Sequence, residues 1–248
     1  MKSTRRDVVR MAALGLVGLP HISRASQPEK EVPSAGEIRE RLNANRALVS
    51  TMRLRYETVT ESGETLSTSD LLFNGRCYYI RREDQRGEMF RMSSPSEEVM
   101  GVERPTRTHR YAQTKRWPPE PSLDTFLPTL TLLSAGVSEV RTAEGDATRI
   151  EVIQGDTVIH VEPESTVVHE RRSIFAPTGR TRLTEVFGDF RTVSPGVVFP
   201  FHVLRQRHDR SGSATTAESL VVVAVAFGEK LDPTAFDIAP YREPRRTE

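Results

Sequence analysis

The chain has 248 residues, of which 36% are hydrophobic and 28% are charged, and its formal net charge is +1. This length is sufficient for one large β domain or two small ones, and the composition suits a sheet with one solvated face. Cys77 is the single cysteine, so an intramolecular disulfide is excluded.

Residues 1–25 have the three parts of an export signal. A positive segment contains Arg5 and Arg6, an apolar run follows at 11–19, and small residues flank Arg24. The apolar run is too short to span a bilayer, which needs about 20 residues. The arginine pair resembles the twin-arginine motif, although Val8 stands where that motif usually has Phe. We predict a cleaved twin-arginine signal peptide, with an ordinary Sec signal as the alternative.

Cleavage after Ala25 changes the charge of the protein. Residues 1–25 hold five of the 35 basic residues and one of the 34 acidic ones, so 30 basic and 33 acidic residues remain, a net charge of −3. A mildly acidic protein is a poor general binder of nucleic acid. Because no cysteine follows the predicted cut, we expect a protein without a lipid anchor, soluble in the periplasm or another extracytoplasmic compartment.

A polar linker at 26–33 precedes the first predicted helix. Ser34 and Glu37 have the spacing of a capping box, in which each side chain binds the backbone N–H of the other. Ile38, Leu42 and Leu48 recur on one face of the following segment. The pattern predicts a helix that ends near Ser50.

Alternation with period two then dominates the chain. It indicates strands near 52–57, 77–80, 148–152, 157–161, 166–175, 181–190, 197–208 and 215–227, some joined by tight turns at Asn74-Gly75 and Gly155-Asp156. The spacing predicts a meander of about a dozen antiparallel strands.

A Pro-rich stretch at 117–121 interrupts the strands. Ser122 then precedes apolar residues that recur at helical spacing, with Pro128 predicted to kink the helix. The predicted fold class is therefore mainly β with two or three helices (α+β). In this fold one highly curved antiparallel sheet forms an incomplete β-barrel, and the helices plug its concave side.

This order of elements resembles the LolA/LolB/RseB superfamily of envelope proteins. The C-terminal part carries the resemblance: an aromatic-Pro pair at Phe199-Pro200 within a strand, and a closing strand followed by a Pro-bearing turn and the segment from Phe236 to Pro240. The resemblance covers about residues 34–241, with 242–248 predicted to be a disordered tail. It implies an apolar cavity that binds acyl chains, as lipoprotein carriers do, or a sensor of lipoproteins or lipopolysaccharide.

A carrier of this kind needs an apolar lining and a lid, because each buried methylene is worth about 0.8 kcal/mol. The alternative is that the same residues form a dry core. The candidate lipid-binding residues are Leu54, Tyr56, Tyr78, Ile80, Ile150, Val152, Ile159, Val161, Phe199 and Phe201, with Phe126, Leu127 and Leu130 as the lid.

The densest basic stretch after residue 25 lies at 104–116. Arg107, Arg110 and Arg116, with Trp117 next to them, are candidates for docking to lipid head groups or to an acidic partner. A solvated edge strand is the competing explanation, since edge charges also block aggregation.

Metal and enzyme signatures are weak. His160, Glu162 and His169 could converge on a metal across a hairpin, but no fourth ligand is evident, so we predict no metal and no cofactor. The sequence has no nucleophile elbow, P-loop, dinucleotide fingerprint or His-Glu-x-x-His motif, although a carboxylate pair of a hydrolase could be hidden among its many acids.

Together these patterns favour a monomeric, non-catalytic protein that binds an acylated lipid or lipoprotein, as a carrier or sensor. The alternative is an RseB-like regulatory or scaffold module that binds another envelope protein and carries no lipid.

Overall fold

The computed structural model describes residues 32–75, 77–94, 97–104, 107–114, 125–126, 137–144, 146–175 and 177–239. The predicted signal peptide and the C-terminal tail lie outside these ranges, as does all of the linker except Val32 and Pro33. Those boundaries therefore stay predictions.

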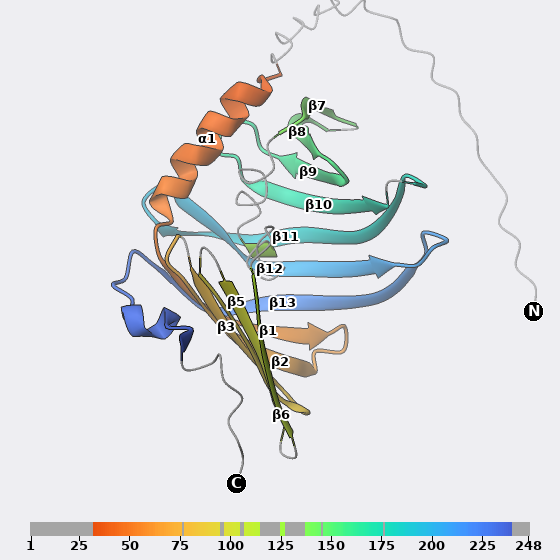
Figure 1. Ribbon diagram of the computed structural model, residues 1–248. Coiled ribbons are helices and arrows are strands. Elements are labelled where there is room, and N and C mark those ends of the chain that lie inside the picture. The colour runs from red at the N-terminus through yellow and green to blue at the C-terminus, as the bar shows by residue number, and fades with distance from the viewer. Residues whose placement is uncertain are drawn as a thin grey trace, which may run out of the picture. The chain divides into compact units, whose positions relative to one another are not determined.

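Thirteen strands in the described part of the chain form a single sheet, and every neighbouring pair is antiparallel (Figure 1). The first six strands are β1 (Met52–Thr60), β2 (Thr65–Phe73), β3 (Tyr78–Asp84), β4 (Gly87–Ser93), β5 (Glu97–Arg104) and β6 (Arg107–Thr114). The other seven are β7 (Glu139–Ala143), β8 (Asp146–Gln154), β9 (Thr157–Val161), β10 (Val168–Phe175), β11 (Arg180–Ser194), β12 (Val197–His208) and β13 (Ala214–Phe227).

The order of the strands joins two meanders at the middle of the sheet. Strands β1 to β6 follow one another outward in one direction, and β13 to β7 follow one another outward in the other. The junction is the pairing of β1 with β13, which aligns Met52 with Phe227 and Thr60 with Glu218. Strands β6 and β7, which are neighbours in sequence, therefore form the two opposite edges.

Alternation along the strands divides the sheet into two faces. Leu54 and Tyr56 are buried on one face of β1, while Arg53 and Arg55 between them are exposed on the other. We call the face of Leu54 the inner face. It carries a continuous apolar cluster, to which β1–β3 and β8–β13 all contribute side chains.

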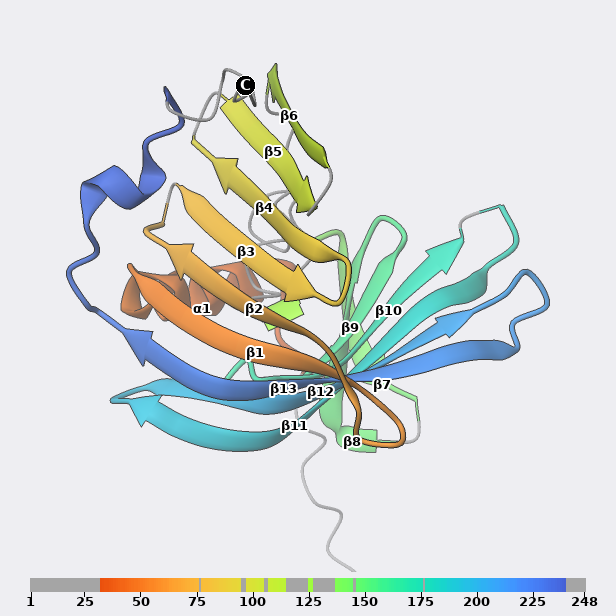
Figure 2. The ribbon, with the colours of Figure 1, turned by 90° about the horizontal axis from the view of Figure 1, so that it is seen from below.

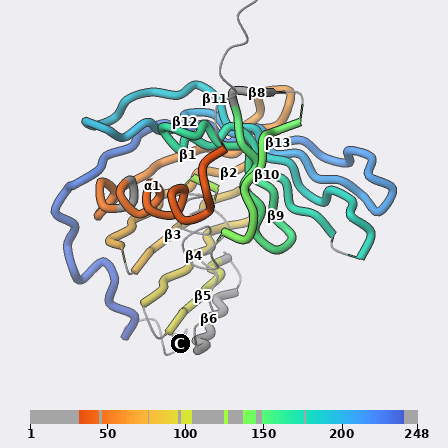
Figure 3. The backbone as a smooth tube through the Cα atoms, turned by 90° about the horizontal axis from the view of Figure 1, so that it is seen from above, coloured from red at the N-terminus to blue at the C-terminus, as the bar shows by residue number. Residues whose placement is uncertain are grey.

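Helix α1 (Ala35–Leu48) covers part of the inner face, across the strands (Figure 3). The predicted capping box forms: Ser34 N donates to Glu37 Oε2 at 2.7 Å, and Glu37 N donates to Ser34 Oγ at 3.3 Å. Ile38 and Leu42 are fully buried in the apolar cluster. This helix agrees with the sequence prediction in its start, its end and the burial of Ile38 and Leu42, whereas Leu48, predicted on the same face, is 46% exposed.

The predicted fold class was wrong about the helices. Within the described residues there is one α-helix, α1, besides the single-turn 3₁₀ helix η1 (Pro233–Phe236) and the two helical residues Thr125 and Phe126. The sheet is open, with β6 and β7 unpaired to each other. The physical reason is that strands from both meanders supply most of the buried side chains of the inner face, so α1 and Phe126 are enough to cover the rest.

Two tight hairpins were predicted. One has the predicted central residues, and the other has a different central pair. Gly155, with φ of 55°, and Asp156 join β8 to β9 as expected. The turn from β2 to β3 instead runs from Asn74 to Cys77, with Asn74 N donating to the Cys77 carbonyl at 3.1 Å. The Asn74 side chain closes it by accepting from Cys77 N at 2.8 Å, so Asn74 begins the turn and is not one of its two central residues.

A smaller apolar cluster lies on the outer face and includes Ile238 of the C-terminal segment that follows β13. Figure 2 shows the course of this segment after β13. Phe90 and Val99 of β4 and β5 are covered there by Ile238. Phe90 packs directly on Gly101, which it faces in the strand register. A Cβ built on Gly101 would lie 2.2 Å from the Phe90 ring.

We predict that Gly101→Ala lowers the free energy of unfolding by about 1–3 kcal/mol, because the buried Phe90 ring must leave its place. Gly188→Ala is the matched control: it is also a strand glycine, but its Cβ would meet no atom within 4 Å. Urea unfolding of both variants measures the difference. Equal midpoints for Gly101→Ala and the wild type would show that Phe90 does not need this glycine.

Candidate functional site

The inner face brings together most of the residues predicted to line a lipid site. Ten of the thirteen belong to the buried apolar cluster: Leu54, Tyr56, Tyr78, Ile80, Phe126, Ile150, Val152, Ile159, Val161 and Phe199. Phe201 is half-buried and packs against the cluster. Leu127 and Leu130 lie outside the described residues. The eleven described residues lie close enough together to line one binding site, and they would lie equally close in a packed core.

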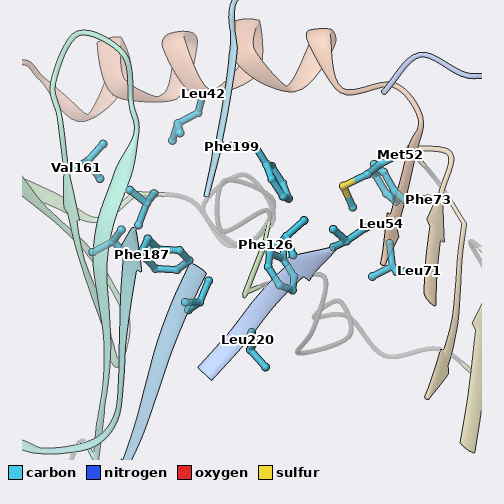
Figure 4. Close-up of a cluster of buried hydrophobic side chains, with 14 of the residues drawn as sticks. Leu42, Met52, Leu54, Leu71, Phe73, Phe126, Val161, Phe187, Phe199 and Leu220 are labelled. Carbon is cyan, nitrogen blue, oxygen red and sulfur yellow. The ribbon is translucent and has the colours of Figure 1, made fainter. Parts of the chain in front are cut away.

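Phe126 lies at the centre of this cluster, and it comes from the segment that connects the two edge strands (Figure 4). Its side chain is 1% exposed. The Phe126 ring centroid is 4.9 Å from that of Tyr56 and 5.9 Å from that of Phe199. Because Tyr56 is on β1 and Phe199 on β12, Phe126 contacts strands from both meanders.

Thr125, next to Phe126, is held by a buried group of charged residues. Its hydroxyl donates to Glu185 Oε1 at 2.9 Å and accepts from Arg205 Nη2 at 2.7 Å. Arg171 Nε donates to Glu185 Oε2 at 2.6 Å, and Arg205 Nη1 donates to Glu218 Oε1 at 3.2 Å. We call Arg171, Glu185, Arg205 and Glu218 the charge network; it crosses the four strands β10 to β13.

The charges of this network balance one another. Glu185 is fully buried and Arg171 is 6% exposed, so neither could be tolerated there without a partner. Burial raises the pKa of Glu185, but the positive charges of Arg171 and Arg205 and the Thr125 hydroxyl outweigh it and hold that pKa below its ordinary value. Burial lowers the pKa of Arg205, and the carboxylates of Glu185 and Glu218 outweigh it and raise that pKa.

Sequence reasoning missed the charge network, although alternation contains a signal for it. Glu185 lies two residues before the buried Phe187, and Arg205 lies two residues after the buried Val203. Residues separated by two share a face of a strand, so both charges fall on the inner face. Charged residues in strands are usually solvated, and for that reason these were not selected.

The basic stretch predicted to dock head groups cannot be placed in full. Arg107 and Arg110 are in β6, an edge strand, as the competing explanation expects. Their side chains lie outside the description, and so do Arg116 and Trp117 entirely. The docking role therefore stays a prediction.

The possible metal site at His160, Glu162 and His169 is not formed. No group of three His, Cys, Asp or Glu residues in the described part of the chain could hold a metal ion. His160 Nε2 lies 3.1 Å from Glu151 Oε1 and 2.9 Å from Arg172 Nη2, within an ion-pair group on the outer face. Arg141 Nε donates to Glu151 at 2.6 Å and completes this group.

A shallow pocket of about 470 Å³ lies on the outer face, over β13, β1, β2 and β3. Arg53, Arg55 and Arg81 line it together with a single acid, Asp70. Arg55 Nε is 4.0 Å from Asp70 Oδ1, and Arg81 Nη2 donates to Glu88 Oε2 at 2.5 Å, so two of the three arginines are paired with a carboxylate. The pocket lies on the face opposite the predicted lipid site, and none of its charged residues was selected from the sequence.

Comparison with known proteins supports the fold alone. No family model matches the chain, and no curated protein matches it in sequence. A domain of known structure from Vibrio parahaemolyticus, provisionally classed as an outer membrane lipoprotein-sorting protein, has a similar fold, with a TM-score of 0.54 and 9% identity. The match covers 85% of this chain and 100% of that domain. The predicted likeness to lipoprotein-sorting proteins is thus confirmed for the fold.

No helix in the described ranges is both long enough and apolar enough to cross a bilayer.

We predict that Glu185→Gln lowers the free energy of unfolding at pH 7 by about 3–5 kcal/mol, because the buried guanidinium of Arg171 and the half-buried one of Arg205 lose their shared partner. The folded pKa of Glu185 is depressed, so the carboxylate stabilises the protein above its unfolded pKa of about 4.3. That contribution is lost as the pH falls through the folded value. Urea unfolding between pH 7 and pH 3 should therefore give a steeper acid loss for the wild type than for the variant.

The matched control is Glu83→Gln, which removes an exposed carboxylate from β3. Its stability should stay within about 0.5 kcal/mol of the wild type. If Glu185→Gln were as stable as Glu83→Gln, the charge network would not stabilise the inner face.

Proposed function

We propose that this protein binds the acyl chains of a lipid or lipoprotein at its inner face, as a non-catalytic monomeric carrier or sensor in the cell envelope. The observation that carries the proposal is the position of Phe126. A side chain from outside the sheet fills the centre of an apolar face lined by residues from both meanders. An acyl chain is chemically similar to the side chain that occupies this place.

The free energies of burial favour replacement of Phe126 by an acyl chain. Removing a buried Phe from a core costs about 3–5 kcal/mol. Burying about ten methylenes of an acyl chain returns about 8 kcal/mol, at about 0.8 kcal/mol each. Loss of the two Thr125 hydrogen bonds to Glu185 and Arg205, at about 0.5–1.5 kcal/mol each, would raise the cost to about 4–8 kcal/mol, which the gain matches or exceeds.

One further observation and one prediction support the proposal. The domain from Vibrio parahaemolyticus that shares this fold is classed with lipoprotein-sorting proteins. The predicted export signal at 1–25 would bring the chain to the compartment in which acylated proteins are moved between membranes. With the signal removed, the protein would be soluble there.

A second candidate function is binding to another envelope protein, without lipid. The pocket on the outer face favours it, because three arginines and one aspartate line it, with Glu88 paired to Arg81 beside it. An acidic segment of a partner would complement this charge. The two candidates use opposite faces, so they can be tested separately.

The first test is native purification of the exported protein, solvent extraction and mass spectrometry of lipids. We expect stoichiometric acylated species in the extract. An extract without lipid, together with no displacement of an added fluorescent fatty acid, would contradict acyl binding and favour the second candidate.

A second test changes the occupant of the inner face. Phe126→Ala removes the side chain that a ligand must displace, so we expect a lower free energy of unfolding, by about 3–5 kcal/mol, together with at least about tenfold tighter binding of a fluorescent fatty acid. Phe175→Ala is the matched control, since Phe175 is 46% exposed at the end of β10. Fluorescence titration gives both affinities. Weaker binding by Phe126→Ala would mean that Phe126 contacts the ligand and is not displaced by it.

A further inference from the structure

Three polar atoms that lie near one another on the inner face are buried and have no hydrogen-bond partner among the described residues. They are Ser67 Oγ, Ser69 Oγ and Arg82 Nε. Ser67 is 3% exposed and Ser69 is 1% exposed. In the strand register Arg82 of β3 lies directly opposite Ser69 of β2, so the two side chains share a face.

Alternation assigns these residues to the inner face. Ser69 and Ser67 follow the fully buried Leu71 at intervals of two in β2, and Arg82 follows the buried Ile80 in the same way in β3. An apolar residue at either serine would fit a dry core better, because a buried unpaired hydroxyl costs free energy. The pattern Ser-x-Ser at inward positions therefore indicates a polar ligand.

The charge of Arg82 is not compensated by its neighbours. In the described part of the chain no carboxylate pairs with it. Asp84, the next residue on the same face of β3, already accepts from the backbone N–H of Arg86 at 2.7 Å. Met89 lies opposite Arg82 on β4 and is apolar. Two hydroxyls and one unpaired guanidinium favour an anionic oxygen ligand, which accepts charge-assisted hydrogen bonds.

The charge network does not offer the same chemistry. Arg171 and Arg205 are matched there by Glu185 and Glu218, so an added anion would meet two carboxylates. A third polar group on the inner face, in which Tyr78 and Arg91 pair with the buried Glu98, is likewise balanced. Asp84 lies opposite Ser67 in the strand register, but it forms no ion pair with Arg82. An anion is therefore expected at Arg82.

The polar atoms lie next to the apolar cluster. Ser69 is opposite Tyr56 of β1 in the register, and the ring of Tyr56 contacts that of Phe126. A ligand whose acyl chain replaced Phe126 would thus have its head group within reach of Ser69 and Arg82. We propose that Arg82, Ser67 and Ser69 bind the anionic head group, phosphate or carboxylate, of the acylated ligand. This inference rests on the proposed acyl-binding function.

The test compares three lipids that share a 14-carbon acyl chain, with inorganic phosphate as a ligand that has no chain. Of the lipids, lysophosphatidic acid and myristate carry an anionic head group, and monomyristoylglycerol carries a neutral one. Calorimetric titration below the critical micelle concentrations should give at least about tenfold tighter binding of one or both anionic lipids than of the neutral one. The stronger of the two identifies the head group as phosphate or carboxylate.

Two variants and one control locate the site. Arg82→Gln should bring the three lipids to within about threefold of one another, since it removes the charge and keeps a polar side chain. Ser67→Ala with Ser69→Ala should also weaken the anionic lipids, while the ligand-free protein unfolds at the same or a higher temperature. Arg182→Gln removes an exposed arginine of β11 that lies in neither proposed site, and it should leave all affinities unchanged.

The outcomes separate the two proposals. Equal binding of the three lipids by the wild type would overturn the head-group site and leave acyl binding intact. Binding of phosphate that is lost in Arg82→Gln, without binding of any lipid, would keep the anion site and overturn the acyl function. If neither lipid nor phosphate binds, both proposals fall.

Discussion

The pairing of β1 with β13 is the constraint on which the rest of the structure depends. It joins the first strand to the last in the middle of the sheet, and it converts two local meanders into one continuous surface. It also makes β6 and β7 the opposite edges, although they are consecutive in sequence. Residues 115–136 therefore connect one edge with the other, and Thr125 and Phe126 of this connection lie on the inner face. The connectivity of the sheet thus brings a segment of the chain to the apolar face.

Thr125 and Phe126 are held on that face by two different kinds of interaction. The Phe126 ring is held by packing on Tyr56 and Phe199, which any apolar group of suitable size can replace. The Thr125 hydroxyl is held by directional bonds to Glu185 and Arg205. Packing contributes more free energy here, whereas the hydrogen bonds fix where the segment lies. A buried charge network that orients a neighbouring segment contributes to specificity more than to net stability.

Local patterns in the sequence predicted much of this structure, and the limits have physical causes. Ser34 and Glu37 interact within one turn of chain, so the capping box and the start of α1 could be predicted without knowledge of the fold. Period-two alternation identified Leu54, Tyr56, Ile150 and Val161 as members of one buried face. The partner of β1, by contrast, is about 160 residues away, and nothing in its own alternation indicates which strand pairs with it. The helix count was wrong because the extent to which a curved sheet fills its own inner face depends on that distant pairing.

The chain shares its fold with a lipoprotein-sorting domain at 9% identity, so the strand pattern can be kept while most side chains differ. A curved meander requires alternation, turns and a central pairing, and many different sequences satisfy these requirements. Selectivity for a ligand depends instead on the few polar residues that face inward. In this chain they form three groups, one of which pairs Tyr78 and Arg91 with Glu98. Arg171 and Arg205, balanced by carboxylates, bind a hydroxyl of the protein itself, whereas Arg82 beside two unpaired serines has no carboxylate partner among the described residues. The distribution of compensating acids on the inner face is therefore the feature that would distinguish the ligand of this protein from that of another protein with the same fold.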